Sequence, residues 1–306
     1  MIDLTISLGK ITFQNPIFAA SGTFGYGVEV PELVDVNKLG AIITKSVTLE
    51  PREGNPPPRI VETPSGMINS IGLANIGIKK FISEMVPVYE NFKTKIILNI
   101  AGSTMDEYVS VLESIESISS VIAGYEINIS CPNVKQGGME FGVNSGITER
   151  LTEKLRNRTE KLLIMKLSPN VADIAAIARA AEEGGADAVS AINTVVGMSI
   201  NPHTFKAGIY TNYGGLSGPA IKPIGLAAVH KIFHSIKIPI IGIGGIVSSF
   251  DALEYFLAGS RAVQIGTANF RNPSAALEIT KGLRNILESK NIKSIEKIIG
   301  KVVTFE

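Results

Sequence analysis

Eight short apolar runs, separated by longer stretches, constrain the fold of this chain more than any other feature. Most of them are dense in Val, Ile or Leu, which is typical of strands buried on both faces of a parallel sheet. The runs are Pro16–Ala20, Ala41–Thr44, Lys95–Ile100, Tyr125–Ile129, Leu162–Leu167, Ala186–Ile192, Ile238–Ile243 and Ala262–Ile265. Together they predict a sheet of eight buried strands.

Segments of helical periodicity lie between several of these runs. In Val171–Glu183 one face collects Ile174 and Ala178, while Asn170 is expected to cap the start and Gly184 to follow the end. The same period recurs in Lys79–Phe92, Met105–Ile118, Thr148–Glu160, Gly225–Ile236, Ser249–Ala258 and Pro273–Leu287. Strands alternating with helices predict an α/β protein, and the count of eight favours a closed (β/α)8 TIM barrel over an open doubly wound sheet.

Two further features modify this barrel. The alternating pattern of Asp3–Asn15 predicts an N-terminal β-hairpin that could plug one end. Three connections, Ser46–Asn75, Cys131–Ile147 and Thr194–Ile224, are too long for a minimal barrel, and such loops are usually lids or binding loops. No linker or break in composition suggests a second domain, so residues 1–306 are expected to form a single barrel domain.

Charge and cysteine content exclude several classes of protein. With 29 basic and 28 acidic side chains, the net charge of +1 argues against a nucleic-acid-binding surface, which needs clustered Lys and Arg. A single cysteine, Cys131, excludes an internal disulfide, a self-contained iron–sulfur cluster and a multi-cysteine zinc site. Met1–Lys10 lacks the pattern of a signal peptide, and stretches such as Ile238–Val247 are far shorter than the about 20 residues that span a bilayer. We therefore expect a cytoplasmic protein that binds neither nucleic acid nor membrane.

Every predicted strand ends in a small or polar group. These groups are Ala20-Ser21-Gly22, Lys45-Ser46, Asn99, Asn128, Lys166, Asn193-Thr194, Gly244-Gly245 and Gly266-Thr267. The active site of such a barrel is built at the C-terminal ends of its strands, so these residues predict a site for a polar ligand. Any one of them could instead be a satisfied structural residue, but eight together are harder to dismiss. If the faces of Asn99 and Asn128 are lumenal, their amides need hydrogen-bond partners, which a ligand would supply.

The glycine pair Gly244-Gly245 has two interpretations. Its GIGG sequence lacks the third glycine and the acidic residue of a dinucleotide fingerprint. In a barrel, the same loop together with Gly266-Thr267 is the standard place for a phosphate group. The alternative is that these glycines only make tight turns.

Cys131 directly follows the fourth predicted strand, in the sequence NISCPN. A lone cysteine is by default a small buried hydrophobic residue. Here it opens a glycine-containing loop that could act as a flap, and its thiolate could serve as a base or nucleophile if the site lowers its pKa from about 8.5. His230 and His234 have a spacing that suits a metal, but they fall on a helix away from the strand ends, so no metal site is expected.

Motifs along nearly the whole chain resemble the cysteine-containing dihydroorotate dehydrogenases, the flavoenzymes of pyrimidine synthesis. They are ASGTFGYG at 20–27, TKSVT at 44–48, NSIGLAN at 69–75, INISCPN at 127–133, MKLSPNV at 165–171, INT at 192–194, GGLSGPAIKP at 214–223, GIGGI and QIGTANF. Each is weak alone, and together they are specific. GGLSGPAIKP and the NVKQGG segment after Cys131 are most similar to the NAD-linked class 1B catalytic subunits, whereas the membrane-associated class has Ser in place of Cys131.

This resemblance implies roles for individual residues, with Cys131 as the catalytic base. It implies FMN contacts from Ser21, Lys45, Ser46, Asn99, Asn128, Lys166, Ile192, Gly218, Gly244, Gly245, Gly266 and Thr267. It implies substrate contacts from Lys45, Asn69, Ser70, Ile71, Gly72, Leu73, Asn128, Asn193 and Thr194. The residue types suit dihydroorotate, because a lysine can bind its carboxylate and paired asparagines can bind its amide edge.

The implied reaction is FMN-dependent oxidation of (S)-dihydroorotate to orotate in de novo UMP synthesis. Class 1B implies a heterotetramer, in which a homodimer of this chain joins a separate subunit that carries FAD and a [2Fe-2S] cluster and passes electrons to NAD. Three alternatives stay open. These are a class 1A-type homodimer that reduces fumarate, a flavin barrel that reduces uracil bases in RNA, and a non-catalytic barrel that only binds an anion.

Overall fold

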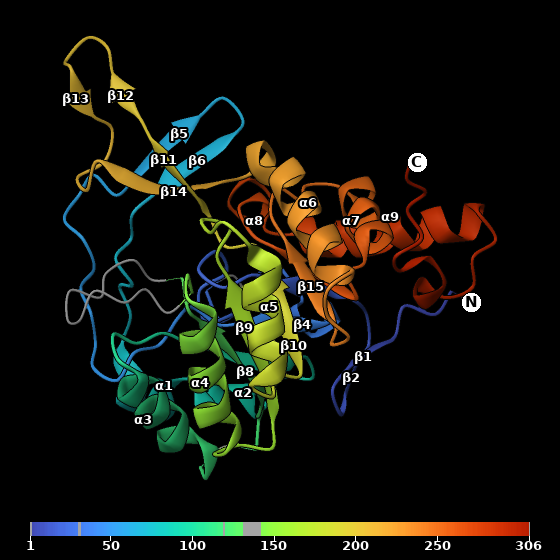
Figure 1. Ribbon diagram of the computed structural model, residues 1–306, viewed down its shortest axis with the longest axis horizontal. Helices are drawn as coiled ribbons and strands as arrows, with labels where there is room; N and C mark the ends of the chain where they lie inside the picture. The colour runs from blue at the N-terminus through green and yellow to red at the C-terminus, as the bar shows by residue number, and fades with distance from the viewer. Residues whose placement is uncertain (1, 30–31, 119, 131–141, 306) are drawn as a thin grey trace.

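The computed structural model describes residues 2–29, 32–118, 120–130 and 142–305, and a closed barrel of eight parallel strands lies at its centre (Figure 1). The strands, in their order around the barrel, are β3 (Ile17–Ala19), β4 (Ala41–Ile43), β7 (Lys95–Ile100), β8 (Ile122–Asn128), β9 (Leu162–Leu167), β10 (Ala188–Ala191), β15 (Ile240–Ile243) and β16 (Ala262–Ile265). Each falls within or overlaps one of the eight apolar runs. Every residue of β9, β10, β15 and β16 is buried, as expected for strands covered on both faces. The predicted (β/α)8 TIM barrel is confirmed.

Amphipathic helices cover the outside of the barrel (Figure 1). They are α1 (Gly77–Glu84), α2 (Val86–Tyr89), α3 (Met105–Glu116), α4 (Ser145–Arg156), α5 (Ile174–Glu183), α6 (Lys222–Phe233), α7 (Ser249–Ala258), α8 (Ala268–Arg271) and α9 (Ala275–Ser289). In α3, Tyr108, Val111, Leu112 and Ile115 are fully buried and share one face, because they follow the helical period. Burying each such side chain stabilises the fold by about 1.5–3 kcal/mol.

Two of the predicted helix features need correction. Lys79–Phe92, predicted as one helix, is divided into α1 and α2, because Pro87 has no N–H with which to continue the hydrogen-bonding of α1. The cap of α5 is Asp173 rather than Asn170, since the Asp173 carboxylate accepts hydrogen bonds from the N–H groups of Ala175 and Ala176 at 3.0 and 3.2 Å.

A hairpin precedes the barrel, as the sequence predicts. Its strands β1 (Ile6–Leu8) and β2 (Ile11–Phe13) pair in antiparallel register around Gly9, which has a φ of +54°. The Phe13 ring lies 4.9 Å from that of Phe18 in β3, and Lys10 forms an ion pair with Glu160, which precedes β9. The hairpin therefore lies at the N-terminal end of the barrel, away from the strand ends that the sequence nominates as the site.

Two of the three long connections form a second sheet. β5 (Ile60–Thr63) and β6 (Gly66–Asn69) come from the first, and β11 (Val195–Met198) and β14 (Tyr213–Ser217) from the third, in the order β11-β14-β6-β5. The sheet projects from one end of the barrel, and β12 (Ile200–Asn201) and β13 (Lys206–Ala207) form a hairpin at its tip (Figure 1). The remaining connection, 131–147, falls largely outside the described residues.

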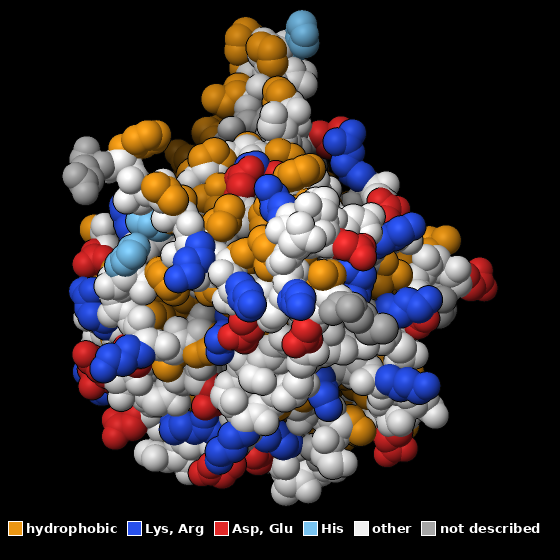
Figure 2. All heavy atoms as spheres, turned by 90° about the vertical axis from the view of Figure 1, so that its right-hand side faces the viewer, with side chains coloured by type: hydrophobic (Ala, Val, Ile, Leu, Met, Phe, Trp, Pro, Cys, Tyr) orange, Lys and Arg blue, Asp and Glu red, His pale blue; other side chains and the backbone are white. Residues whose placement is uncertain are grey.

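The surface agrees with the nearly neutral composition. On the face shown in Figure 2, basic and acidic side chains are interspersed, and hydrophobic side chains gather on the projecting arm. Ile200, Phe205 and Tyr213 on that arm are more than half exposed, at 60%, 89% and 62%. None of the described helices combines the length and hydrophobicity that crossing a membrane requires.

Candidate active site

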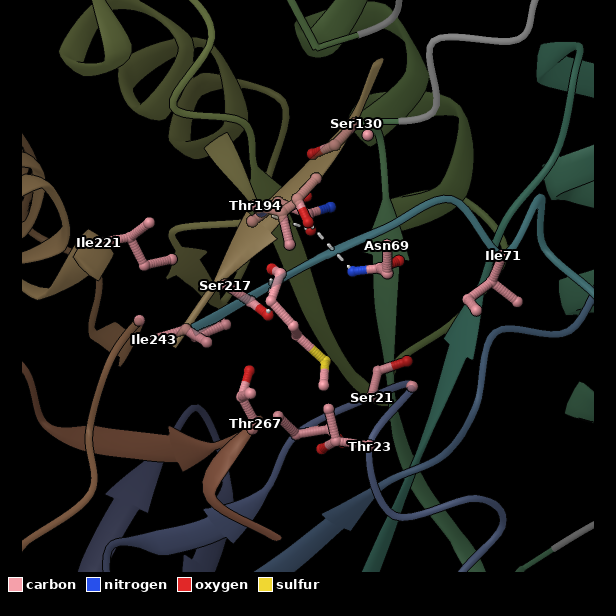
Figure 3. A pocket seen from close by; sticks show the side chains of 18 of the residues that line it. Ser21, Thr23, Asn69, Ile71, Ser130, Thr194, Ser217, Ile221, Ile243 and Thr267 are labelled. Carbon is pink, nitrogen blue, oxygen red and sulfur yellow. Dashed lines mark hydrogen bonds between the residues drawn. The ribbon is translucent and has the colours of Figure 1, made fainter. Parts of the chain in front are cut away.

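A cavity of about 730 Å³ opens at the C-terminal ends of the barrel strands, beneath the second sheet. This volume lies within the range of about 300–1,000 Å³ typical of small-molecule sites. In Figure 3, Ser21, Thr23 and Thr267 from the barrel lie on one side of the cavity and Ser130 lies on the opposite side. Asn69, from the second sheet, also points its amide toward the cavity. The barrel and the sheet therefore share one site.

Nearly all residues that the sequence nominates line this cavity. Those that line it are Ser21, Lys45, Ser46, Asn69, Ser70, Ile71, Gly72, Leu73, Asn128, Lys166, Ile192, Asn193, Thr194, Gly218, Gly244, Gly245, Gly266 and Thr267. Asn99 does not line it but lies directly behind, where its side-chain oxygen accepts a hydrogen bond from Ser46 Oγ at 2.6 Å. Cys131 lies outside the described residues.

Lys45 is a partly buried cation in the wall of the cavity. Within the part of the chain that the structure describes, no carboxylate lies within 4.0 Å of its ammonium group. Burial lowers the pKa of Lys45, and the more distant Glu29 carboxylate opposes this shift. A ligand with a negative charge would compensate the buried ammonium group.

Two asparagine amides lie together at the ends of β8 and β10, the two strands that flank β9. Asn193 donates from Nδ2 to Asn128 Oδ1 at 3.3 Å, and Asn193 Oδ1 accepts from the N–H of Thr194 at 2.8 Å. Across the cavity, Asn69 donates to the carbonyl of Gly215 in β14 at 3.2 Å. Each amide keeps hydrogen-bonding capacity beyond these bonds, so the group can bind a ring with both donors and acceptors.

Glycines leave space at the other end of the cavity. A Cβ atom added to Gly22 would meet nothing within 4 Å, and one added to Gly266 would come no closer than 3.7 Å to its neighbours. Gly244 and Gly245 have φ values of +129° and +66°, which side-chain-bearing residues rarely adopt. The Gly244-Gly245 turn therefore requires glycine, and the open space beside Gly22 and Gly266 has room for a phosphate group.

The lumen beneath the cavity holds polar residues that the sequence did not nominate. Glu126 is fully buried and accepts hydrogen bonds from Asn99, Ser190 and Gln264. The Asn99 amide therefore finds partners within the protein, where the sequence suggested that a ligand would supply them. Strand alternation could have predicted the position of Glu126, because Glu126 and Asn128 occupy the same face of β8.

The described residues hold no group of three or more His, Cys, Asp or Glu side chains that could bind a metal ion. His230 and His234 lie on and just after α6, with their Nε2 atoms 3.3 Å apart, away from the cavity. Among the described residues, the site thus contains the Lys45 ammonium group without an ion pair, the Lys166 ammonium group paired with Glu126, several amides and a glycine-lined recess. These features define the class of protein as a (β/α)8 barrel enzyme that holds a polar, anionic small molecule at its strand ends.

Comparison with known proteins identifies the family. The sequence model described as dihydroorotate dehydrogenase matches residues 3–287, so the chain belongs to the dihydroorotate dehydrogenase family. The "Dihydroorotate dehydrogenase B (NAD(+)), catalytic subunit" of Thermoanaerobacter sp. (strain X514) is 47% identical over 98% of both chains. The proteins of the same name from Geotalea uraniireducens (strain Rf4) and Bacteroides thetaiotaomicron are also 47% identical, over 99% and 98% of this chain and 99% of theirs.

A solved structure is similar in fold. The crystal structure of DHODH in complex with ferulenol from Eimeria tenella superposes with a TM-score of 0.82 over 98% of this chain and 88% of that one. Its sequence identity is 23%, so the likeness supports the barrel fold alone.

Proposed function

We propose that this chain is the catalytic subunit of an NAD-linked dihydroorotate dehydrogenase, which oxidises (S)-dihydroorotate to orotate in de novo UMP synthesis in the cytoplasm. The observation that carries the proposal is the partly buried ammonium group of Lys45, without an ion pair among the described residues, in the same cavity as the paired amides of a chain of this family. The family is flavin-dependent, and the curated relatives named above act with NAD(+) by name.

The cavity suits FMN in both its polar and its open parts. The recess above Gly22 and Gly266, with the turn at Gly244-Gly245, has room for a phosphate group near backbone N–H groups. The amide and ammonium groups of Asn128 and Lys166 suit the pyrimidine edge of the flavin ring. The full proposed FMN set is Ser21, Lys45, Ser46, Asn99, Asn128, Lys166, Ile192, Gly218, Gly244, Gly245, Gly266 and Thr267. We propose that the whole chain works as one FMN-binding domain.

Dihydroorotate would lie between the barrel mouth and the second sheet. Lys45 would pair with its carboxylate, while Asn128 and Asn193 would hold the amide edge of the ring. Asn69 and Thr194 would close the site from the side of the sheet. The full proposed substrate set is Lys45, Asn69, Ser70, Ile71, Gly72, Leu73, Asn128, Asn193 and Thr194.

Oxidation of dihydroorotate removes a proton from ring C5 and a hydride from ring C6, and a C5=C6 double bond forms. Cys131 is the proposed base, and its thiolate takes the C5 proton to become a thiol. Bound FMN supplies the acceptor for the C6 hydride, which carries the two electrons. Lys166, at the end of β9, would stabilise the negative charge that reduction places on the ring.

The name "catalytic subunit" of the relatives implies a partner subunit. We propose that a homodimer of this chain binds an electron-transfer subunit with FAD and a [2Fe-2S] cluster, and that electrons reach NAD through it. The single cysteine of this chain supports a separate carrier, because such a cluster generally needs four thiolates.

One set of measurements tests this function. Purified protein should carry a flavin that absorbs near about 450 nm, and anaerobic dihydroorotate should bleach it. A protein that binds flavin but is not bleached would be a non-catalytic barrel. Turnover with NAD should need the partner subunit, whereas efficient turnover with fumarate by the chain alone would identify the class 1A type instead.

A further inference from the structure

Directly beneath the cavity, the carboxylate of Glu126 gathers several hydrogen-bond donors. Asn99 Nδ2 donates to Oε2 at 2.7 Å, while Ser190 Oγ and Gln264 Nε2 donate to Oε1 at 2.8 and 2.5 Å. Glu126, Asn99 and Ser190 are completely buried, and Gln264 is 1% exposed. We call these four residues the Glu126 cluster.

Two links join the Glu126 cluster to the cavity. Lys166 lines the cavity, its ammonium group lies 3.8 Å from Glu126 Oε2, and its side chain is 8% exposed. Ser46, which also lines the cavity, donates to Asn99 Oδ1. A change in charge at Glu126 would therefore act on the lysine proposed to contact the flavin.

A carboxylate in this position is costly for the fold. Removing a carboxylate from water is costly, and apolar residues of similar size often replace buried ion pairs without loss of stability. The neighbours of Glu126 in β8, Tyr125 and Ile127, are fully buried as well, so the carboxylate lies in a part of the strand without access to solvent. An ionised carboxylate only accepts hydrogen bonds, which matches its three donors and the nearby ammonium group. The position of this carboxylate is therefore better explained by its interaction with the Lys166 ammonium group than by packing of the core.

We infer that Glu126 is a positioning residue that holds the Lys166 ammonium group at the floor of the site and partly offsets its charge, an inference that rests on the proposed FMN site. Because Lys166 favours the reduced, anionic flavin, an opposing carboxylate beside it limits that effect. Glu126 therefore sets the reduction potential of the bound flavin lower than Lys166 alone would.

The test is the flavin midpoint potential of Glu126→Gln, which removes the charge and keeps the size of the side chain. The equilibrium should move about tenfold toward reduced flavin, which is about 30 mV more positive for a two-electron couple. Sulfite, whose adduct places negative charge on the flavin, should bind about tenfold more tightly to the variant. Equal potentials and equal sulfite affinities in the variant and the wild-type protein would overturn the inference.

Ser190→Ala is the matched control, because it removes one hydrogen bond from the Glu126 cluster without changing a charge. Its potential should stay close to that of the wild-type protein, and a shift as large as that of Glu126→Gln would refute a role for the charge. In a Lys166→Met background, Glu126→Gln should shift the potential much less. An undiminished shift would show that Glu126 does not act through Lys166.

Glu126→Asp serves if Glu126→Gln fails to fold or to retain FMN. It keeps the charge but withdraws it from Lys166 by one methylene group, so a smaller positive shift is expected, and no shift would count against the inference. Wild-type protein without bound flavin would instead contradict the proposed function itself, which separates the two failures.

Discussion

Lys45 is the residue whose surroundings say most about the ligand. Its ammonium group is partly buried, and among the described residues no carboxylate lies near enough to form an ion pair. Such a group destabilises the folded protein until an anion binds to it. Its position is therefore better explained by ligand binding than by a contribution to stability.

Replacing Lys45 with Met should remove the partner of the substrate carboxylate. A charged hydrogen bond of about 1.5–3 kcal/mol corresponds to orotate binding weaker by about tenfold to a hundredfold. Orotate titrations followed by the flavin spectrum would measure this. Lys10→Met, on the distant hairpin, is the control and should bind orotate like the wild-type protein.

The lowered pKa of Lys45 also predicts a pH dependence. Below that pKa the ammonium group is present, binds the anion, and carries its full desolvation cost in the ligand-free fold. As the pH rises through the lowered pKa, which lies below the ordinary value of about 10.4, the charge is lost and orotate affinity should fall. The fall should be absent in Lys45→Met, and its persistence there would assign it to another group.

Cys131 is the proposed base, and its replacement by Ala should leave FMN bound. Reduction of the flavin by dihydroorotate should slow by about 10²–10⁴-fold, the usual contribution of a general base. Stopped-flow measurement of flavin bleaching checks this directly. Reduction at the wild-type rate would contradict the assignment.

At the scale of elements, the second sheet holds one side of the site. β14 pairs with β6 through Gly215 and Asn69, and Gly215 also packs against Thr194, which directly precedes β11. Residues proposed to bind the substrate come from two loops distant in sequence, and backbone hydrogen bonds of the sheet join these loops.

Gly215→Ala tests this dependence, because the added Cβ would lie 2.1 Å from Thr194 Oγ1. Thr194 must move, so substrate binding should weaken by about tenfold while flavin content stays unchanged. Gly197→Ala is the matched control in the same sheet, since its Cβ would have ordinary contacts of 3.5 Å or more. Equal substrate KM values for the two variants would show that the sheet does not position Thr194.

The helices show where local patterns suffice and where they do not. The bounds of α7 agree with the period alone, and Ser248 and Asp251 form a capping box at its start. For α5, the expected cap Asn170 bonds instead to Thr194 and Val196, residues distant in sequence. An asparagine side chain can cap a helix or hydrogen-bond to the backbone of a loop, and the sequence alone does not distinguish these two roles.

At the scale of the whole molecule, the two ends of the barrel differ in role. One end is closed by packing, and the other carries the site. The hairpin covers the N-terminal end, whereas the open cavity and the second sheet occupy the C-terminal end. The closed sheet leaves no free edge among its eight strands, which allows the strand ends to carry amides and cations without loss of backbone pairing.

The sequence by itself predicted the eight strands, the helices between them, and almost all of the small or polar strand-end residues that line the cavity. Strands that are buried on both faces have continuous apolar sequences. Closure of a parallel barrel brings the C-terminal ends of all its strands together, whatever the sequences of the loops. These properties are local or follow from topology, so periodicity and position suffice to predict them.

Only the tertiary structure decided which distant segments pair. It joined 46–75 to 194–224 as one sheet, left Lys45 without an ion pair among the described residues, and placed Glu126 under Lys166. Such contacts depend on how the loops close and on the directions of side chains in the closed barrel. A local sequence pattern therefore does not predict them.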